Sequence, residues 1–159
     1  MNADEFRLLT LKHFAFLRIE FDCRTECGNA VPGFPDTLGS YETFFQNRTT
    51  GISIQFEIIE RLPTVHLHRL STVANERNIF ALGLLLLVRA PGLNPLKDEV
   101  GLPLSKDVET LLMEYALALK VTGEDILRGD FSVFPDLERE WLRQVELRKA
   151  AGASKFIYF

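Results

Sequence analysis

The chain has 159 residues, of which 47% are apolar and 25% are charged, and its formal net charge is −4. This length and composition predict a single globular domain over residues 1–159, large enough to bury roughly two-thirds of the surface of its unfolded chain. The acidic balance argues against nucleic acid as the main ligand, because phosphate binding requires a concentrated positive surface, and it favours a basic partner.

Neither the apolar segments along the chain nor the number of cysteines indicates a membrane protein or a secreted protein. Residues Met1–Glu5 are acidic and lack the basic start of a signal peptide. The longest apolar run, Ile79–Val88, has about half the length of a membrane-spanning helix. Two cysteines, Cys23 and Cys27, are too few for a disulfide framework. We therefore expect a cytoplasmic protein that does not contact a membrane.

The first half of the chain predicts one helix followed by an antiparallel meander. Asn2 can cap a helix over Ala3–Phe16, and alternating apolar and polar residues predict a strand over Leu17–Cys23. Glycine and proline residues make Arg24–Ser40 a long loop. The same alternation predicts the three strands of the meander at Tyr41–Gln46, Ile52–Glu60 and Val65–Leu70, with a hairpin turn over Asn47–Gly51.

The second half of the chain predicts helices. The expected helices are Ile79–Arg89, a segment from a cap at Ser105 to a stop at Gly123, and a segment from a cap at Asp136 to Ala151. The apolar tail Lys155–Phe159 is expected to dock as a strand on its own chain or on a second copy. The predicted fold class is α+β: an antiparallel three- to four-stranded β-meander with an N-terminal helix and three or more C-terminal helices packed on one face.

Four residues supply the ligand types of a zinc site. Cys23 and Cys27 are separated by three residues, and His66 and His68 lie two apart on a predicted strand, so both imidazoles project from the same face. Two thiolates and two imidazoles complete a tetrahedral zinc set. Zinc knuckles usually place two residues between their cysteines, and this chain has three. The same four residues are also explained as ordinary surface histidines and free thiols.

The residues present do not support other catalytic patterns. Glu20 and Asp22 would share one strand face as a general acid and base, but an ordinary surface strand already predicts polar residues there. A metal-dependent nuclease built on Asp36 and Glu57 needs a lysine two residues after the glutamate, where the chain has Ile59. The sequence also lacks a phosphate-binding loop, a dinucleotide fingerprint and the Gly-x-Ser-x-Gly motif of hydrolases.

The segment Leu127–Glu138 has the distinctive pattern Leu-x-Gly-Asp-Phe-x-x-Phe-Pro-x-Leu-Glu. Together with Phe14–Leu17, Tyr41-Glu42 and Gly51–Ile54, it resembles a family of small bacterial α+β proteins, some of them with immunity-protein-like folds. The shared motifs are structural, so the resemblance implies a fold and an immunity-type role, and it implies no active site.

These observations favour a non-catalytic protein-binding module, whose most specific form is an immunity-type antidote that masks a toxin by an acidic surface. Aromatic anchors and one acidic residue would contact the partner: Tyr41, Phe44, Phe45 and Glu57. Two alternatives remain open. One is a small metal-dependent or hydrolytic enzyme centred on the cysteines and histidines, with zinc as its cofactor, and the other is a homodimer whose apolar tail forms the interface.

Overall fold

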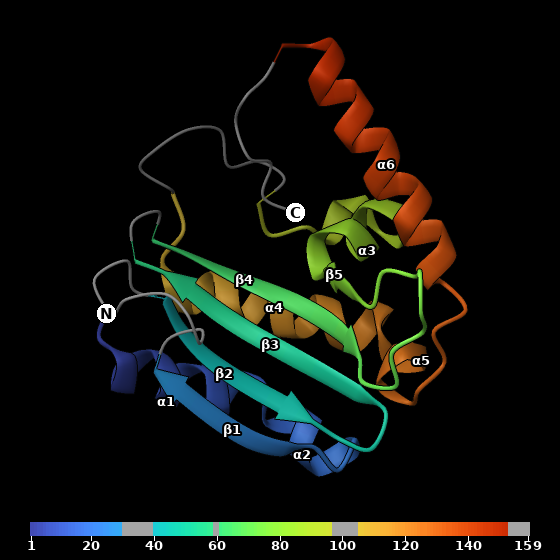
Figure 1. The fold of residues 1–159 in the computed structure, drawn as a ribbon. Helices are drawn as coiled ribbons and strands as arrows, with labels where there is room; N and C mark the ends of the chain where they lie inside the picture. The colour runs from blue at the N-terminus through green and yellow to red at the C-terminus, as the bar shows by residue number, and fades with distance from the viewer. Residues whose placement is uncertain (30–39, 59–60, 97–104, 153–159) are drawn as a thin grey trace.

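The computed structural model describes residues 1–29, 40–58, 61–96 and 105–152, with the backbone alone for residues 27–29 (Figure 1). The expected tail strand at 155–159 and residues 30–39 of the expected loop lie outside these described residues. None of the helices in the described ranges has both the length and the apolar character needed to cross a membrane.

Two short helices open the chain. They are α1 (Ala3–His13) and α2 (Ala15–Glu20). Asn2 caps α1 as expected: its side chain accepts from the Glu5 backbone N–H at 2.9 Å, while the Glu5 carboxylate accepts from the Asn2 N–H at 2.8 Å. The strand predicted at 17–23 is wrong, because Phe14 and Leu17 are fully buried at helical spacing and continue the inner face of α1.

Five antiparallel strands form one sheet in the order β1-β2-β3-β4-β5. They are β1 (Arg24–Asn29), β2 (Ser40–Gln46), β3 (Thr50–Glu57), β4 (Leu62–Arg69) and β5 (Ile79–Ala81). The antiparallel meander is confirmed, but the sheet has five strands where three or four were expected. The added strands come from the first residues of the predicted loop, which pair with β2, and from the start of the predicted helix at Ile79, which pairs with β4.

The remaining elements within the described residues are helices, as expected. The elements are α3 (Leu82–Arg89), the 3₁₀ turn η2 (Pro91–Leu93), α4 (Val108–Thr122), α5 (Glu124–Leu127) and α6 (Phe134–Ala150). Asp107, and not Ser105, caps α4 by accepting from the Thr110 N–H at 2.7 Å. Helix α6 begins before Asp136, with Pro135 in its first turn and no side-chain cap.

The hydrophobic core lies between the sheet and the helices α1, α2 and α4, all behind the sheet in Figure 1. Ile52, Ile54 and Phe56 of β3 are buried on this side, and the Phe6 ring lies 5.5 Å from the Phe56 ring. Helix α3 extends the core beyond β5. There the ring of Phe80 in β5 packs edge-on against the ring of Phe134 in α6, with ring centroids 5.0 Å apart. One face of the sheet is therefore filled by helices, which leaves the other face as the place to look for a site.

Candidate functional site

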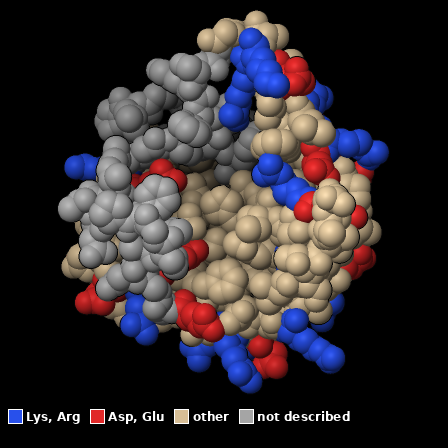
Figure 2. All heavy atoms as spheres, in the orientation of Figure 1, with Lys and Arg blue, Asp and Glu red and all other residues tan. Residues whose placement is uncertain are grey.

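The sheet face turned away from α1, α2 and α4 is called the open face here. Because alternate strand residues point to opposite sides, the strand register assigns its members. They are Arg24, Glu26 and Gly28 of β1; Ser40, Glu42, Phe44 and Gln46 of β2; Gly51, Ser53, Gln55 and Glu57 of β3; Leu62, Thr64, His66 and His68 of β4; and Ile79 and Ala81 of β5. Figure 2 looks onto this face and shows a hollow lined mainly by uncharged residues, with charged side chains on its border.

Phe44 is the large aromatic side chain of this face, and Gly51 of the adjacent strand provides the space for its ring. A Cβ atom placed on Gly51 would lie 2.5 Å from Phe44 Cζ, so the ring rests directly on the glycine backbone. The ring also meets His68 edge-on, with centroids 5.2 Å apart and planes at 89°. Phe44 is half-buried, so it is both held in place and accessible.

The two histidines make the centre of the open face uncharged at neutral pH. Burial, and to a smaller extent the neighbouring His66, lowers the pKa of His68 to about 4. Burial also lowers the pKa of His66, against the opposing effect of Glu42. His68 Nε2 lies 3.0 Å from Ser53 Oγ, whereas the buried Nδ1 of His66 has no hydrogen-bond partner within the described part of the chain.

The Ser53–His68 hydrogen bond has the geometry of a nucleophile and its base, but its surroundings do not suit catalysis. Ser53 is fully buried, so a substrate atom has no access to its hydroxyl. A histidine with a pKa of about 4 is also a weak base at neutral pH. We therefore interpret the pair as a structural bond that fixes the His68 ring beside Phe44.

Three glutamates lie on the open face, with Glu26 directly opposite Phe44, and Arg24 of β1 lies on the same face opposite Gln46. Glu42 accepts a hydrogen bond from the Gln55 amide at 2.9 Å, and Glu26 of β1 accepts one from the Gln46 amide at 2.6 Å. Glu57 ends β3 on the same face, paired in register with Ser40. A carboxylate accepts several hydrogen bonds at once, so these groups keep acceptor capacity for a cationic partner.

The four partner-binding residues expected from the sequence separate onto two faces. Phe44 and Glu57 lie on the open face. The expectation that Phe45 contacts a partner is corrected. Phe45 is fully buried and its ring centroid lies 6.3 Å from that of Phe14, so no partner reaches it in the folded protein. Tyr41 also points to the helix side, where it stacks on Phe56 with a centroid distance of 6.2 Å.

The structure does not bring the expected zinc ligands together. His66 and His68 lie on the open face of β4, whereas Cys23 is buried in the core, where burial raises the pKa of its thiol to about 11. Cys27 is three strand spacings from His66, about 14 Å, and a shared zinc ion requires bonds of about 2 Å. Within the described residues, no group of three or more His, Cys, Asp or Glu side chains could hold a metal ion.

Glu20 and Asp22 do not share a strand face either. Glu20 lies at the end of α2 and forms an ion pair with Lys120 of α4 at 2.5 Å. Asp22 follows the helix with φ at +53°, the left-handed conformation of a residue that ends a helix and turns the chain. Both carboxylates therefore serve local structure.

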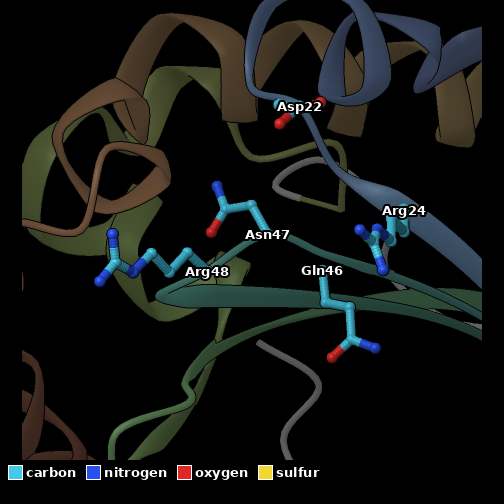
Figure 3. A pocket seen from close by; sticks show the side chains of 5 residues that line it. All are labelled: Asp22, Arg24, Gln46, Asn47 and Arg48. Atoms are coloured by element: carbon cyan, nitrogen blue, oxygen red, sulfur yellow. The ribbon is translucent and has the colours of Figure 1, made fainter.

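A cavity of about 340 Å³ lies beside the hairpin that joins β2 to β3, lined by Asp22, Arg24, Gln46, Asn47 and Arg48. Its polar groups do not converge: Figure 3 shows Arg24 and Arg48 pointing in different directions. The Asn47 side chain is already used, since its oxygen accepts from the Thr50 N–H at 2.9 Å and its amide donates to the Leu127 carbonyl at 3.0 Å. The cavity thus supplies no constellation for binding or catalysis.

Sequence reasoning missed Gly51 and Ser53, the two residues that position Phe44 and His68. Both effects depend on which residues face each other across strands, which hydrophobic alternation alone does not specify. Alternation could, however, have separated Phe44 from Phe45, because adjacent strand residues always face opposite sides. No protein-family model, curated protein or solved structure matches this chain.

Proposed function

We propose that this protein is a non-catalytic protein-binding module that contacts its partner through the open face of the sheet. The observation that carries the proposal is Phe44, a half-buried aromatic ring of the open face that is held between Gly51 and His68. The hollow on this face is lined mainly by uncharged residues (Figure 2). Protein interfaces place their strongest contacts on such central aromatic anchors, with polar groups around them. A pre-positioned ring also loses little conformational entropy on binding.

The border of the surface indicates the chemistry of the partner. Glu26, Glu42 and Glu57 lie on the same face of three neighbouring strands, and the chain as a whole carries a net charge of −4. Complementary charges speed the encounter of two proteins and select the partner. The proposed partner therefore presents an apolar group to Phe44 and Lys or Arg side chains to the glutamates. In the most specific form of the proposal, suggested by the family resemblance, that partner is a toxin and this chain is its antidote.

A photo-crosslinking experiment in the native host tests where a partner binds. A photoreactive amino acid replaces Gln46 on the open face in one variant and Leu147, which is 51% exposed on α6, in the control variant. We expect one protein with a basic surface to be crosslinked from position 46 and not from position 147. Crosslinks to a common protein from position 147 alone would contradict the proposal.

Affinity measurements with the purified partner then test the anchor. We expect Phe44→Ala to weaken binding by roughly tenfold to a hundredfold, since a central aromatic anchor typically contributes that much. The variant Glu57→Gln should mainly slow association and reduce its dependence on salt. Leu147→Ala is the matched control, and circular dichroism verifies that each variant is folded. Unchanged affinity of a folded Phe44→Ala variant would overturn the proposal.

A further inference from the structure

The outer face of the helix layer is unusually apolar. It lies on the far side of the sheet from the open face, because α1, α2 and α4 pack behind the strands (Figure 1). Exposed aliphatic and methionine side chains follow one line along α4: Met113 is 51% exposed, Leu117 60% and Val121 63%. These three residues, spaced four apart, are called the α4 ridge.

Helix α4 is apolar on two opposite sides. Its inner side carries Leu112, Tyr115 and Leu119, all fully buried against the sheet. An ordinary surface helix has charged or polar residues opposite such a stripe, where α4 has its ridge. Glu109, Glu114 and Lys120 lie between the two apolar sides, and the exposed apolar stripe opposite the buried one marks the α4 ridge as a candidate interaction surface.

The neighbouring helix continues the apolar surface, and ion pairs within the chain neutralise its border. Ile19 on α2 is 81% exposed. Beside it, Lys120 of α4 pairs with Glu20 at 2.5 Å, and at the other end of α4 Lys12 pairs with Glu109 at 2.7 Å. A strongly charged partner would gain little from these two neutral pairs, and a second copy meets no net charge at either of them.

We propose that the α4 ridge is the interface of a homodimer in which the α4 helices of two copies pack antiparallel across a two-fold axis at Leu117. Met113 and Val121 lie equally far from Leu117 along the helix, so the two-fold places Met113 of one copy opposite Val121 of the other. Residues spaced by four form the ridges of the commonest helix-packing class, with axes crossing at about −50°. The antiparallel arrangement also opposes the helix dipoles favourably.

The size of the surface sets the expected strength of the dimer. The α4 ridge covers about 12 Å of helix, and Ile19 extends it by one helix to the side. Four exposed side chains make a smaller face than a standard stable interface, which buries about 800 Å² on each partner. We therefore expect a reversible dimer that dissociates on dilution, and not an obligate one.

Sedimentation of the full chain over a range of micromolar concentrations tests the proposal. We expect the wild type to pass from monomer to dimer with concentration, and Leu117→Glu to weaken the dimer by roughly a hundredfold or more, because two carboxylates would face each other in an apolar contact. Leu147→Glu changes an equally apolar residue with similar exposure on α6 and should leave the dimer unchanged. A wild type that stays monomeric, or a dimer that Leu117→Glu leaves intact, would overturn the proposal.

A second variant covers the case in which Leu117→Glu does not fold. Leu117→Cys lies on the proposed axis, where two copies of one residue come close enough for a disulfide. We expect mild oxidation to give a covalent dimer from this variant, and not from Leu147→Cys or the wild type. A dimer in solution that Leu117→Cys fails to crosslink would place the interface elsewhere.

Discussion

At the scale of single residues, the Tyr115 hydroxyl is the clearest unfavourable feature of the core. The side chain is fully buried in α4, and its oxygen has no hydrogen-bond partner among the described residues. A buried hydroxyl without a partner costs free energy that the unfolded chain avoids by bonding to water. We therefore expect Tyr115→Phe to raise the free energy of unfolding by about 1 kcal/mol.

Urea unfolding measures this difference, with Tyr41→Phe as the control, since Tyr41 is only partly buried. If Tyr115→Phe instead lowers stability by a similar amount, the hydroxyl has a partner, such as a buried water molecule.

His68 should make stability depend on pH. Its pKa falls from an ordinary 6.5 to about 4 in the folded protein, mainly through burial. Because the folded state resists protonation, the unfolded state binds more protons between these two values. Above about pH 6.5, His68 is neutral in both states and does not affect stability. As the pH falls from 6.5 towards 4, His68 is protonated mainly in the unfolded state, so the free energy of unfolding decreases.

Unfolding free energies measured at pH 7 and pH 4.5 test this prediction. We expect His68→Gln, which keeps a hydrogen-bonding group near Ser53, to lose less stability between these pH values than the wild type. The same comparison for Leu147→Ala, an exposed apolar residue, controls for the general effect of acid. Identical pH dependence in the wild type and His68→Gln would show that the His68 ring is not buried as described.

At the scale of elements, the β2–β3 pair couples a glycine to an aromatic ring. We expect Gly51→Ala to lower the free energy of unfolding by about 1–3 kcal/mol, because the added Cβ would lie 2.5 Å from Phe44 Cζ and displace the ring. In a Phe44→Ala background only Leu70 Cδ2, 3.2 Å from the added Cβ, remains close, so the same substitution should cost much less.

A double-mutant cycle in urea measures this coupling. Gly92→Ala is the matched control, since no atom lies within 4 Å of a Cβ at that position. An equal cost of Gly51→Ala with and without Phe44 would mean that the backbone, and not the ring, requires the glycine.

The elements also show where sequence patterns suffice and where they do not. Long regular patterns succeed: the alternation of β3 and the apolar stripe of α4 both predicted their elements correctly. Short segments can fit both the two-residue repeat of a strand and the 3.6-residue repeat of a helix. Residues 17–23 alternate like a strand, yet Leu17 also continues the buried side of the preceding helix, and tertiary burial decided for the helix. Likewise, Ile79–Ala81 became a strand because β4 had a free edge to pair with.

The candidate site was less predictable than the fold. Alternation predicted that His66 and His68 share one face of their strand, which the register confirms, but the prediction did not separate Phe44 from Tyr41 and Phe45 on the opposite face. The ring of Phe44 over Gly51, and the bond of His68 to Ser53, depend on cross-strand register and on side-chain rotamers. A one-residue shift in register would reverse every side chain of a strand, so a single sequence cannot specify such contacts.

At the scale of the whole molecule, the two proposed surfaces lie on opposite sides of the sheet. The open face is in front in Figure 1, and the α4 ridge is on the outer side of the helices behind it. Dimerisation through the α4 ridge would therefore leave both open faces free and pointing away from each other. Such a dimer would bind two separate partner molecules, one on each side, and its two open faces could not both engage one flat surface.

This arrangement predicts that the two surfaces act independently. Phe44→Ala should leave the dimer mass unchanged, and Leu117→Glu should leave the affinity for soluble partner within about twofold, because sites with no shared contacts behave additively. On a surface coated with partner, Leu117→Glu should likewise leave the dissociation rate unchanged within about twofold, since open faces that point in opposite directions cannot both attach to one surface. Calorimetry in solution and release from coated sensors measure the two quantities. If Leu117→Glu also weakened binding in solution by more than about tenfold, the two surfaces would be coupled through the sheet, contrary to their separation in this fold.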